Sequence, residues 1–493
     1  MHPLADTISR RSFLTQTVAG GVTACSALAR PAWAAPQGAN DAIRVGVVGV
    51  RGKGGHHIEM LRAIPGVRVV ALCDVDEAVL NSRAGELSAA GIQVTKHMDI
   101  RTLLESKDVD AVSIATPNHW HSLMAIWACQ AGKDVYLEKP ISHNVWEGRK
   151  VVEAAAKYNR IVQAGTQSRS DEALLELAAY LRGGALGRIL RARGFCYKRR
   201  ESIGKVAGPQ PIPAGVNYDL FCGPAPLEPL RRAHLHYDWH WIWATGNGDI
   251  GNQGVHEMDM CRWMLGEEKL PRSVFSIGGR FVENDDAETP NTQIAVYDYA
   301  SAPLISEVRG LPAKTDVKHM DHYGGVRIGI AIECEHGTFV GGGGGGVVYD
   351  GDGKRVKSFT STGGDTHMEN FIQAVRSRKA QDLKAPITGG HMSSALCHLG
   401  NISYRLGTEM TAPEIAARAG SRADVTETLE RLESHLAANG VDPAHVKPTA
   451  GPMLTLVPDE ERFESSSEYD MGAFGNGLLR DGYRPPYVVP EQV

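Results

Sequence analysis

The 493-residue sequence lacks several features that would place it in a particular class of proteins. None of its apolar runs reaches the roughly 18–20 residues that a membrane-spanning helix needs. It has no excess of positive charge either: the formal net charge is −5, whereas a nucleic-acid partner requires a basic face. No internal repeat is evident, and 42% hydrophobic with 22% charged residues excludes disorder throughout. We therefore expect a globular protein of two or three domains, with neither a membrane span nor a nucleic-acid partner.

Cysteine is also scarce. The eight cysteines are widely spaced and form no Cys-x-x-Cys pair, which argues against a disulfide framework and against a zinc site. Most lie in apolar stretches, so we expect them to be buried thiols. We predict no metal site; His236, His240 and His256 are the only combination that comes into question, and they lack a regular ligand spacing.

The N-terminus indicates where the protein works. Residues 9–14 (SRRSFL) have the form of a twin-arginine export signal, followed by a short apolar stretch and the small-x-small triplet of residues 32–34. We expect residues 1–34 to be a signal peptide that is removed after export to the periplasm by the twin-arginine machinery. Residues 22–25 (VTAC) also resemble a lipoprotein cleavage box, which would make Cys25 a lipid anchor. The twin-arginine route exports proteins that have already folded in the cytosol, which is compatible with buried thiols.

Residues 42–165 alternate short apolar runs with helical stretches. Five of the runs are strand-like and rich in β-branched residues: Ile43–Val48, Val67–Cys73, Ala111–Ala115, Asp134–Glu138 and Ile161–Ala164. Nearly continuous apolar strands separated by helices predict a doubly wound parallel sheet, covered on both faces, in an α/β protein.

A glycine-rich loop follows the first of these strands and opens a helix. It contains Gly49, Gly52 and Gly54, with Arg51 in place of the middle glycine of the usual dinucleotide motif. A pyrophosphate would meet free N–H groups and the positive end of the helix dipole there. Asp74 ends the second strand 25 residues after Gly49, close to the ~20 expected for the acid that binds a ribose 2′-hydroxyl. A carboxylate repels a 2′-phosphate, so the pattern favours NAD over NADP; a tight turn that binds nothing is the alternative.

Three further segments complete a family pattern. Residues 116–121 (TPNHWH) follow the third strand, residues 138–140 (EKP) close the fourth, and residues 248–256 read GDIGNQGVH. With the glycine loop and Asp74, they resemble the Gfo/Idh/MocA family, named for glucose–fructose oxidoreductase and inositol dehydrogenases. The resemblance implies an NAD(P)-dependent oxidoreductase with a Rossmann domain and a C-terminal α+β domain, whose largely antiparallel open sheet forms the substrate pocket. We expect cofactor contacts at the glycine loop and at Thr116, Pro117, Asn118, His121 and Glu138, and we expect a homo-oligomer.

The resemblance also implies the catalytic residues. It places Lys139 beside the nicotinamide and the substrate hydroxyl, with a cis bond before Pro140. Oxidation of an alcohol by hydride loss requires removal of the hydroxyl proton, which a partly desolvated lysine can accept. His256 matches the acid/base histidine of the family, but Asn252 stands where many members have an aspartate. Since an asparagine can position a hydroxyl but cannot take its proton, we expect Lys139 and His256 to handle the proton.

Several nearby residues allow more than one interpretation. Asp249 and Asp259 could compensate for the missing aspartate, or Asp259 could form an ion pair. Residues 234–243, dense in aromatic residues and histidine, suit either stacking on a sugar ring or the filling of a core or subunit interface. Tyr197 could reach the substrate or be a sheet residue with a bonded hydroxyl.

The rest of the chain is expected to form a substrate and oligomerisation domain (166–410) and a tail (411–493). Apolar residues at helical spacing predict helices over 392–406 and 425–436, the second ending at Asn439-Gly440. The six glycines of Gly341–Gly346 indicate a loop or a strongly bent hairpin. Prolines at 485, 486 and 490 indicate an extended tail that wraps a surface, either its own or a neighbouring subunit's.

We therefore expect an exported oxidoreductase that moves hydride between a tightly bound NAD and a hydroxyl of a sugar or cyclic polyol. The periplasm is not expected to hold a soluble nicotinamide pool, so the cofactor must be regenerated in place. Either one sugar is oxidised and another reduced, or a single glycoside passes through oxidation, elimination, hydration and reduction, which would make the protein a glycosidase. Arg51 and Asn252 leave a non-catalytic sugar-binding protein as a further alternative.

Overall fold

The computed structural model describes residues 42–364, 366–420, 422–442 and 445–493. The expected export signal, cleavage triplet and lipidation site at Cys25 lie outside these residues. Among the described helices, none is both long and apolar enough to cross a membrane.

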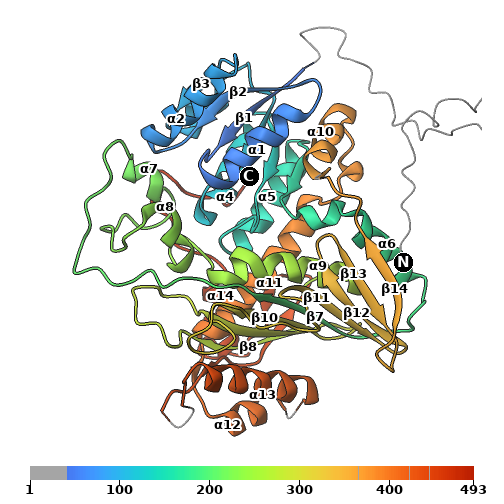
Figure 1. Ribbon diagram of the computed structural model, residues 1–493. Helices are drawn as coiled ribbons and strands as arrows, with labels where there is room; N and C mark the ends of the chain where they lie inside the picture. Colours follow the sequence, from blue (N-terminus) through green and yellow to red (C-terminus); the bar gives the residue numbers. More distant parts are fainter. Residues whose placement is uncertain (1–41, 365, 421, 443–444) are drawn as a thin grey trace, which may run out of the picture. The chain divides into compact units, whose positions relative to one another are not determined.

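Residues 43–164 form the predicted parallel sheet (Figure 1). Its strands follow the order β3-β2-β1-β4-β5-β6, and every neighbouring pair is parallel. The strands are β1 (Ile43–Val48), β2 (Val67–Cys73), β3 (Thr95–His97), β4 (Ala111–Ile114), β5 (Asp134–Leu137) and β6 (Val162–Ala164). The connecting helices are α1 (Gly52–Ala63), α2 (Glu77–Ala89), α3 (Ile100–Leu104), α4 (Asn118–Gln130) and α5 (Val145–Lys157). The five predicted strands are confirmed, whereas the short polar strand β3 was not predicted.

A larger mixed sheet follows, and with it the predicted fold class is confirmed. Its order is β14-β13-β12-β11-β7-β10-β9-β8-β16-β15, with β17 also paired to β8 and β18 to β17. Only β7 and β10 run parallel, so the sheet is largely antiparallel. The strands are β7 (Ile189–Tyr197), β8 (Ser273–Gly279), β9 (Thr292–Asp298), β10 (Leu304–Arg309), β11 (Ile328–Cys334), β12 (Gly337–Gly342), β13 (Gly345–Tyr349), β14 (Arg355–Thr360), β15 (Thr408–Glu409), β16 (Thr449–Ala450), β17 (Leu454–Val457) and β18 (Arg462–Phe463).

The six consecutive glycines form a hairpin, one of the two predicted possibilities. Gly341 pairs with Gly346 and Gly342 with Gly345 across β12 and β13. A Cβ on Gly341 would lie 2.3 Å from the carbonyl oxygen of Gly345, and Gly345 itself has a φ of +115°. The close approach of the two backbones therefore accounts for glycine at these positions.

Helices cover the larger sheet on both faces. Alternate residues of β8 point to opposite sides: Val274 joins the cluster with α6 (Glu172–Arg182), α9 (Val255–Leu265) and α11 (Ile387–Arg405). Phe275 joins the cluster with α12 (Ala412–Arg418) and α13 (Ala423–Ala438). The two predicted helices, α11 and α13, are confirmed.

Buried charge links α13 to the sheet. Arg193 is fully buried and forms ion pairs with Glu307 and with Glu427 of α13. Tyr197 donates its hydroxyl to Glu307 at 2.8 Å in the same cluster. Tyr197 is therefore a sheet residue, and the idea that it reaches the substrate is wrong. The seven cysteines of the described chain are all free and buried, as expected.

Segments from the end of the sequence complete the first sheet's surroundings. α10 (His367–Ser377) contributes Met368 and Phe371 to the core beneath α1. The final residues run along α4, where the ring centroid of Tyr487 lies 5.4 Å from that of Trp120. The proline-rich tail therefore wraps its own chain. In the sequence between α10 and these final residues, α14 (Met471–Gly477) packs near β17 and β18.

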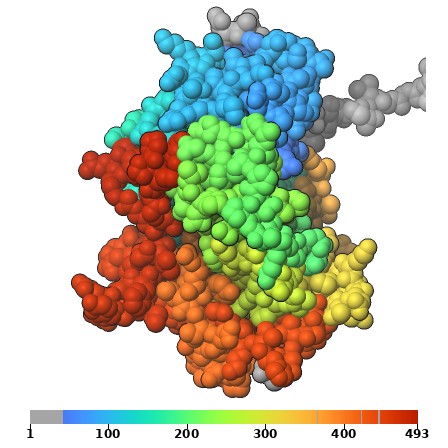
Figure 2. All heavy atoms as spheres, turned by 90° about the vertical axis from the view of Figure 1, so that its left-hand side faces the viewer, coloured from blue at the N-terminus to red at the C-terminus, as the bar shows by residue number. Residues whose placement is uncertain are grey.

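One long connection crosses from the larger sheet to the parallel one. Residues 198–246, here called the crossing segment, contain α7 (Tyr218–Cys222), α8 (Leu235–Asp238) and the 3₁₀ turn Trp239–Trp241. The N–H of Asn217 donates to the carbonyl of Val75 at 2.9 Å, and that of Glu77 to the carbonyl of Gly215 at 3.0 Å. In Figure 2 the segment, in green, lies against the N-terminal strands and helices, in blue. It thus reaches the connection between β2 and α2.

Candidate active site

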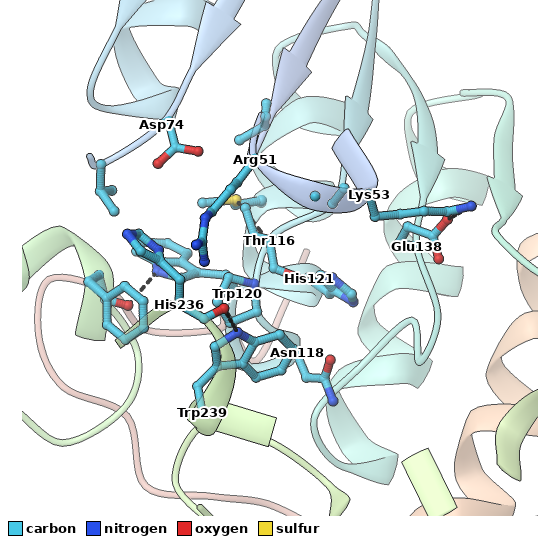
Figure 3. Close-up of a pocket in the computed structure, with 18 of the residues that line it drawn as sticks. Arg51, Lys53, Asp74, Thr116, Asn118, Trp120, His121, Glu138, His236 and Trp239 are labelled. Atoms are coloured by element: carbon cyan, nitrogen blue, oxygen red, sulfur yellow. Dashed lines mark hydrogen bonds and ion pairs between the residues drawn. The ribbon is translucent and has the colours of Figure 1, made fainter. Parts of the chain in front are cut away.

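A cavity of about 530 Å³ lies at the carboxyl ends of the parallel strands (Figure 3). The crossing segment closes it with Leu220, Phe221 and the residues of α8 and its following turn. Twelve of the thirteen residues predicted for the site line the cavity: Gly49, Arg51, Gly52, Asp74, Thr116, Pro117, Asn118, His121, Glu138, Lys139, Asn252 and His256. The structure therefore brings the separate sequence motifs together at one place.

The glycine loop forms a bare helix N-terminus facing this cavity. Gly49 has a φ of +76°, and a Cβ on Gly54 would lie 1.8 Å from the carbonyl oxygen of Gly49. Gly54, the thirteenth predicted residue, thus packs under the loop rather than lining the cavity. The first turn of α1 has no acidic residue and no side-chain cap, so its N–H groups remain available to an anion. These features fit a dinucleotide pyrophosphate, and Figure 3 shows Arg51 pointing into the cavity beside the loop.

Asp74 is fixed at the end of β2. Its carboxylate accepts hydrogen bonds from the N–H of Val50 at 2.9 Å and of Asp76 at 3.1 Å. Burial raises the pKa of Asp74, although these two hydrogen bonds oppose the shift. Asp99 lines the same end of the cavity. Two carboxylates there fit a ribose diol better than a 2′-phosphate.

The crossing segment is bonded to this end of the cavity through a histidine. Nε2 of His236 lies 2.7 Å from Oδ2 of Asp76, and the indole N–H of Trp239 donates to the carbonyl of His236 at 3.1 Å. Asp76 also caps α2 by accepting from the N–H groups of Ala78 and Val79. The stretch dense in aromatic residues therefore belongs to the cavity wall. Within the described residues, no group of three potential metal ligands occurs.

Glu138 is a buried carboxylate at the end of β5. It lies 3.0 Å from Nε2 of His57, accepts from the side chain of Gln167 at 3.0 Å, and lies 3.6 Å from Nζ of Lys53. Burial alone would raise the pKa of Glu138, but the His57 hydrogen bond and the charges of Lys53 and Lys139 hold it well below its ordinary value. The group is therefore an anchored anion next to the proposed catalytic lysine, rather than a solvated loop residue.

Lys139 follows directly and points to the other domain. Its ammonium donates to the carbonyl oxygen of Asn252 at 2.6 Å, and the Lys139–Pro140 bond is cis, as the resemblance implies. Burial lowers the pKa of Lys139, while Glu138 opposes that shift. A lowered pKa increases the fraction of neutral amine, which is the form that can accept a proton. His121 positions this loop, because its ring nitrogens lie 2.6 Å from the carbonyl of Pro140 and 2.8 Å from that of Thr116.

His256 stands at the start of α9, beside Lys139. Burial, reinforced by the charge of Lys139, lowers the pKa of His256 to about 3, so the ring is neutral at physiological pH. Asn252 contributes its backbone carbonyl to Lys139. Asp249 pairs with Arg200 at 2.6 Å, and Asp259 is paired elsewhere, with Arg169. Neither acid lines the cavity.

Sequence reasoning missed the residues that hold these groups in place. His57, Ser113 and Gln167 fix Glu138, since Nδ1 of His57 lies 2.8 Å from the Ser113 hydroxyl. The Asp76–His236 contact was missed as well. The one available signal was the polar His57 on a helix face that is otherwise apolar or glycine.

Comparisons with known proteins agree with this geometry. Residues 43–166 match the family model described as the oxidoreductase family with an NAD-binding Rossmann fold, and residues 181–305 match the model of its C-terminal alpha/beta domain. Together the two matches cover slightly more than half of the chain.

Individual relatives share about a third or less of their residues with this chain over the matched part. Inositol 2-dehydrogenase 4 of Saccharopolyspora erythraea is 30% identical over 270 residues, which are 54% of this chain and 66% of that protein. The chain spans 43–66% of the length of the first three curated relatives.

Solved structures share the fold. The WlbA dehydrogenase of Bordetella pertussis, in complex with NADH and UDP-GlcNAcA, has a TM-score of 0.55 at 20% identity and covers 74% of this chain and 97% of its own. Levoglucosan dehydrogenase, in complex with NADH and levoglucosan, has a TM-score of 0.55 at 18% identity, with coverages of 72% and 95%. From the two family models and the motifs gathered in one cavity, the chain belongs to the Gfo/Idh/MocA oxidoreductase family, with an NAD-binding Rossmann domain.

Proposed function

We propose that the protein is an NAD-dependent oxidoreductase that acts on a hydroxyl of a sugar or cyclic polyol. The observation that carries the proposal is the meeting of Lys139 and His256 in the same cavity as the glycine loop and Asp74. The named activities of the relatives support the substrate class, since they include dehydrogenases of inositol and of levoglucosan.

Each residue has a role that its surroundings support. The glycine loop would hold the pyrophosphate, and Asp74 the adenosine ribose. The bound nicotinamide would supply the hydride acceptor. Lys139, whose pKa is lowered by burial, would take the hydroxyl proton, and the neutral His256 would orient the hydroxyl or share that proton. Glu138 keeps a negative charge beside Lys139, which favours the protonated ammonium that forms when Lys139 takes the proton.

The experiment starts from the cofactor. Protein purified without added nucleotide is denatured and its supernatant assayed for NAD, and the intact protein is then tested for NADH formation with polyols. Lys139→Ala should abolish turnover and retain cofactor, whereas Lys198→Ala, a control on the crossing segment outside the cavity lining, should leave both unchanged. A protein that neither contains nor binds NAD would refute the proposal, and unchanged turnover of Lys139→Ala would remove the lysine from it.

A redox-neutral glycosidase is the second candidate. It is favoured by the crossing segment, because its hydrogen bonds to the β2–α2 connection favour a cofactor that stays bound between turnovers and is regenerated in place. Release of a sugar from a glycoside without added cofactor and without net oxidation distinguishes this chemistry from that of a dehydrogenase.

Export and assembly are proposals that the sequence supports. We propose export by the twin-arginine route, on the basis of residues 9–14 and 32–34. Replacing Arg10 and Arg11 by lysine should leave the protein in the cytoplasmic fraction. The family resemblance supports a homo-oligomer, whose contact surface would lie away from the part of the larger sheet that α13 covers.

A further inference from the structure

The crossing segment brings a second histidine to the cavity. His240 lines the cavity together with Lys139 and His256. It lies on the 3₁₀ turn Trp239–Trp241, outside the motifs that contain Lys139 and His256. The turn is firmly held: the Trp239 and His240 rings stack with centroids 3.6 Å apart, and the Thr245 hydroxyl donates to the carbonyl of Trp239 at 2.9 Å.

Its hydrogen bonding fixes which ring nitrogen carries the hydrogen. Nδ1 of His240 lies 2.6 Å from the carbonyl oxygen of Tyr237, and since a carbonyl only accepts, Nδ1 must donate. Burial, with the charges of Lys139 and Arg200, lowers the pKa of His240 to about 3 against the opposing Tyr237 hydrogen bond, so the ring is neutral. In a neutral ring with hydrogen on Nδ1, Nε2 is an acceptor. Nε2 has no hydrogen-bond partner within the described part of the chain.

The neighbouring groups offer a complementary arrangement. Lys139 is a donor at the same end of the cavity, and its proton-accepting role concerns the hydroxyl that is oxidised. A weakly basic acceptor beside it is suited to receive a hydrogen bond from a second hydroxyl. Sugars and cyclic polyols carry such hydroxyls on adjacent carbons.

We propose that Nε2 of His240 is a specificity-determining acceptor, which binds a substrate hydroxyl other than the one that is oxidised. The inference rests on the proposed function, because it assumes a polyol in this cavity. It assigns substrate selection to the crossing segment, while Lys139 and His256 carry out the proton transfer. A site built around one fixed acceptor discriminates against an analogue that lacks the matching hydroxyl.

The test compares His240→Ala and His240→Gln with the wild type and with His234→Ala, whose exposed side chain belongs to the same segment but not to the cavity lining. Glutamine can place an acceptor oxygen near the position of Nε2. NAD-loaded protein is titrated calorimetrically with myo-inositol, D-glucose and their monodeoxy derivatives, and NADH formation is followed separately. The NAD content of each variant verifies that it folds.

We expect His240→Ala to weaken polyol binding and raise KM about tenfold with little change in kcat, corresponding to one hydrogen bond. His240→Gln should recover most of this loss, and His234→Ala should match the wild type. The monodeoxy derivative that lacks the selected hydroxyl should bind the wild type and His240→Ala equally weakly.

Three results would overturn the inference: equal binding by wild type and His240→Ala, a glutamine variant as weak as the alanine variant, or a wild type that binds no polyol. If the wild type binds polyols but forms no NADH, the proposed oxidoreductase function fails while the binding comparison still decides the role of His240.

Discussion

Removal of the His236 side chain should accelerate release of the cofactor. The crossing segment is joined to the β2–α2 connection by the His236–Asp76 hydrogen bond at 2.7 Å and by the two backbone hydrogen bonds of Asn217 and Glu77. The side chains of His236 and Asp76 are 24% and 10% exposed, so water screens the contact only in part. A hydrogen bond to a carboxylate in such a position contributes about 1.5 kcal/mol. Its loss corresponds to roughly tenfold more frequent opening of the segment.

The assay measures the dissociation rate of NAD directly. His236→Ala protein is loaded with labelled NAD, chased with an excess of unlabelled NAD, and filtered at intervals. We expect a dissociation rate about tenfold above that of the wild type, because the two backbone hydrogen bonds remain. His234→Ala is the matched control, since that side chain is exposed on the same segment. Equal rates for wild type and His236→Ala, or equal acceleration by the control, would refute the idea that this contact retains the cofactor.

Two glycine substitutions test local packing, one beside the glycine loop and one inside α2 away from the cavity. Gly54→Ala should abolish cofactor binding, measured by isothermal NAD titration, because the new Cβ would lie 1.8 Å from the Gly49 carbonyl oxygen. Gly85→Ala has open space around it inside α2 and should raise the unfolding free energy by about 0.5–1 kcal/mol, measured by thermal unfolding. Burial raises the pKa of Glu257 to about 8, so its contribution to stability is full below pH 4.5 and lost as the pH rises toward 8; Glu257→Gln should flatten the fall of Tm between pH 5 and 8, and an unchanged slope would assign that fall to other groups.

The parallel sheet was predictable because its strands are buried on both faces. β1 and β2 have the predicted bounds, and their nearly continuous apolar runs are typical of strands covered by helices on either side. β3 escaped prediction since Thr95–His97 is short, polar and partly exposed, and it is a strand only through its pairing with β2. The local sequence pattern therefore predicts strands that are buried on both faces. It does not predict a short polar strand that forms only by hydrogen bonding to its neighbour.

The same distinction applies to the site. Asp74 and Lys139 were predictable because residues at the carboxyl ends of parallel strands share one edge of the sheet. The contacts His236–Asp76 and His57–Glu138 join residues 160 and 81 positions apart. No spacing rule connects such pairs, since their distance depends on how the crossing segment and α1 pack. The sequence therefore predicts the residues proposed for the chemistry better than the residues that hold them in place.

The packing of the late segments around the first sheet has a consequence for the order of folding. Met368 and Phe371 of α10 belong to the core under α1, and Tyr487 and Val489 belong to the cluster around α4. During synthesis the parallel sheet emerges from the ribosome long before these residues exist. Its apolar surfaces stay exposed, or are shielded by a chaperone, until the last covering residues have been made, some three hundred residues later. A fragment cut after β6 would leave these surfaces uncovered, so we expect the nucleotide-binding part of this chain not to fold on its own.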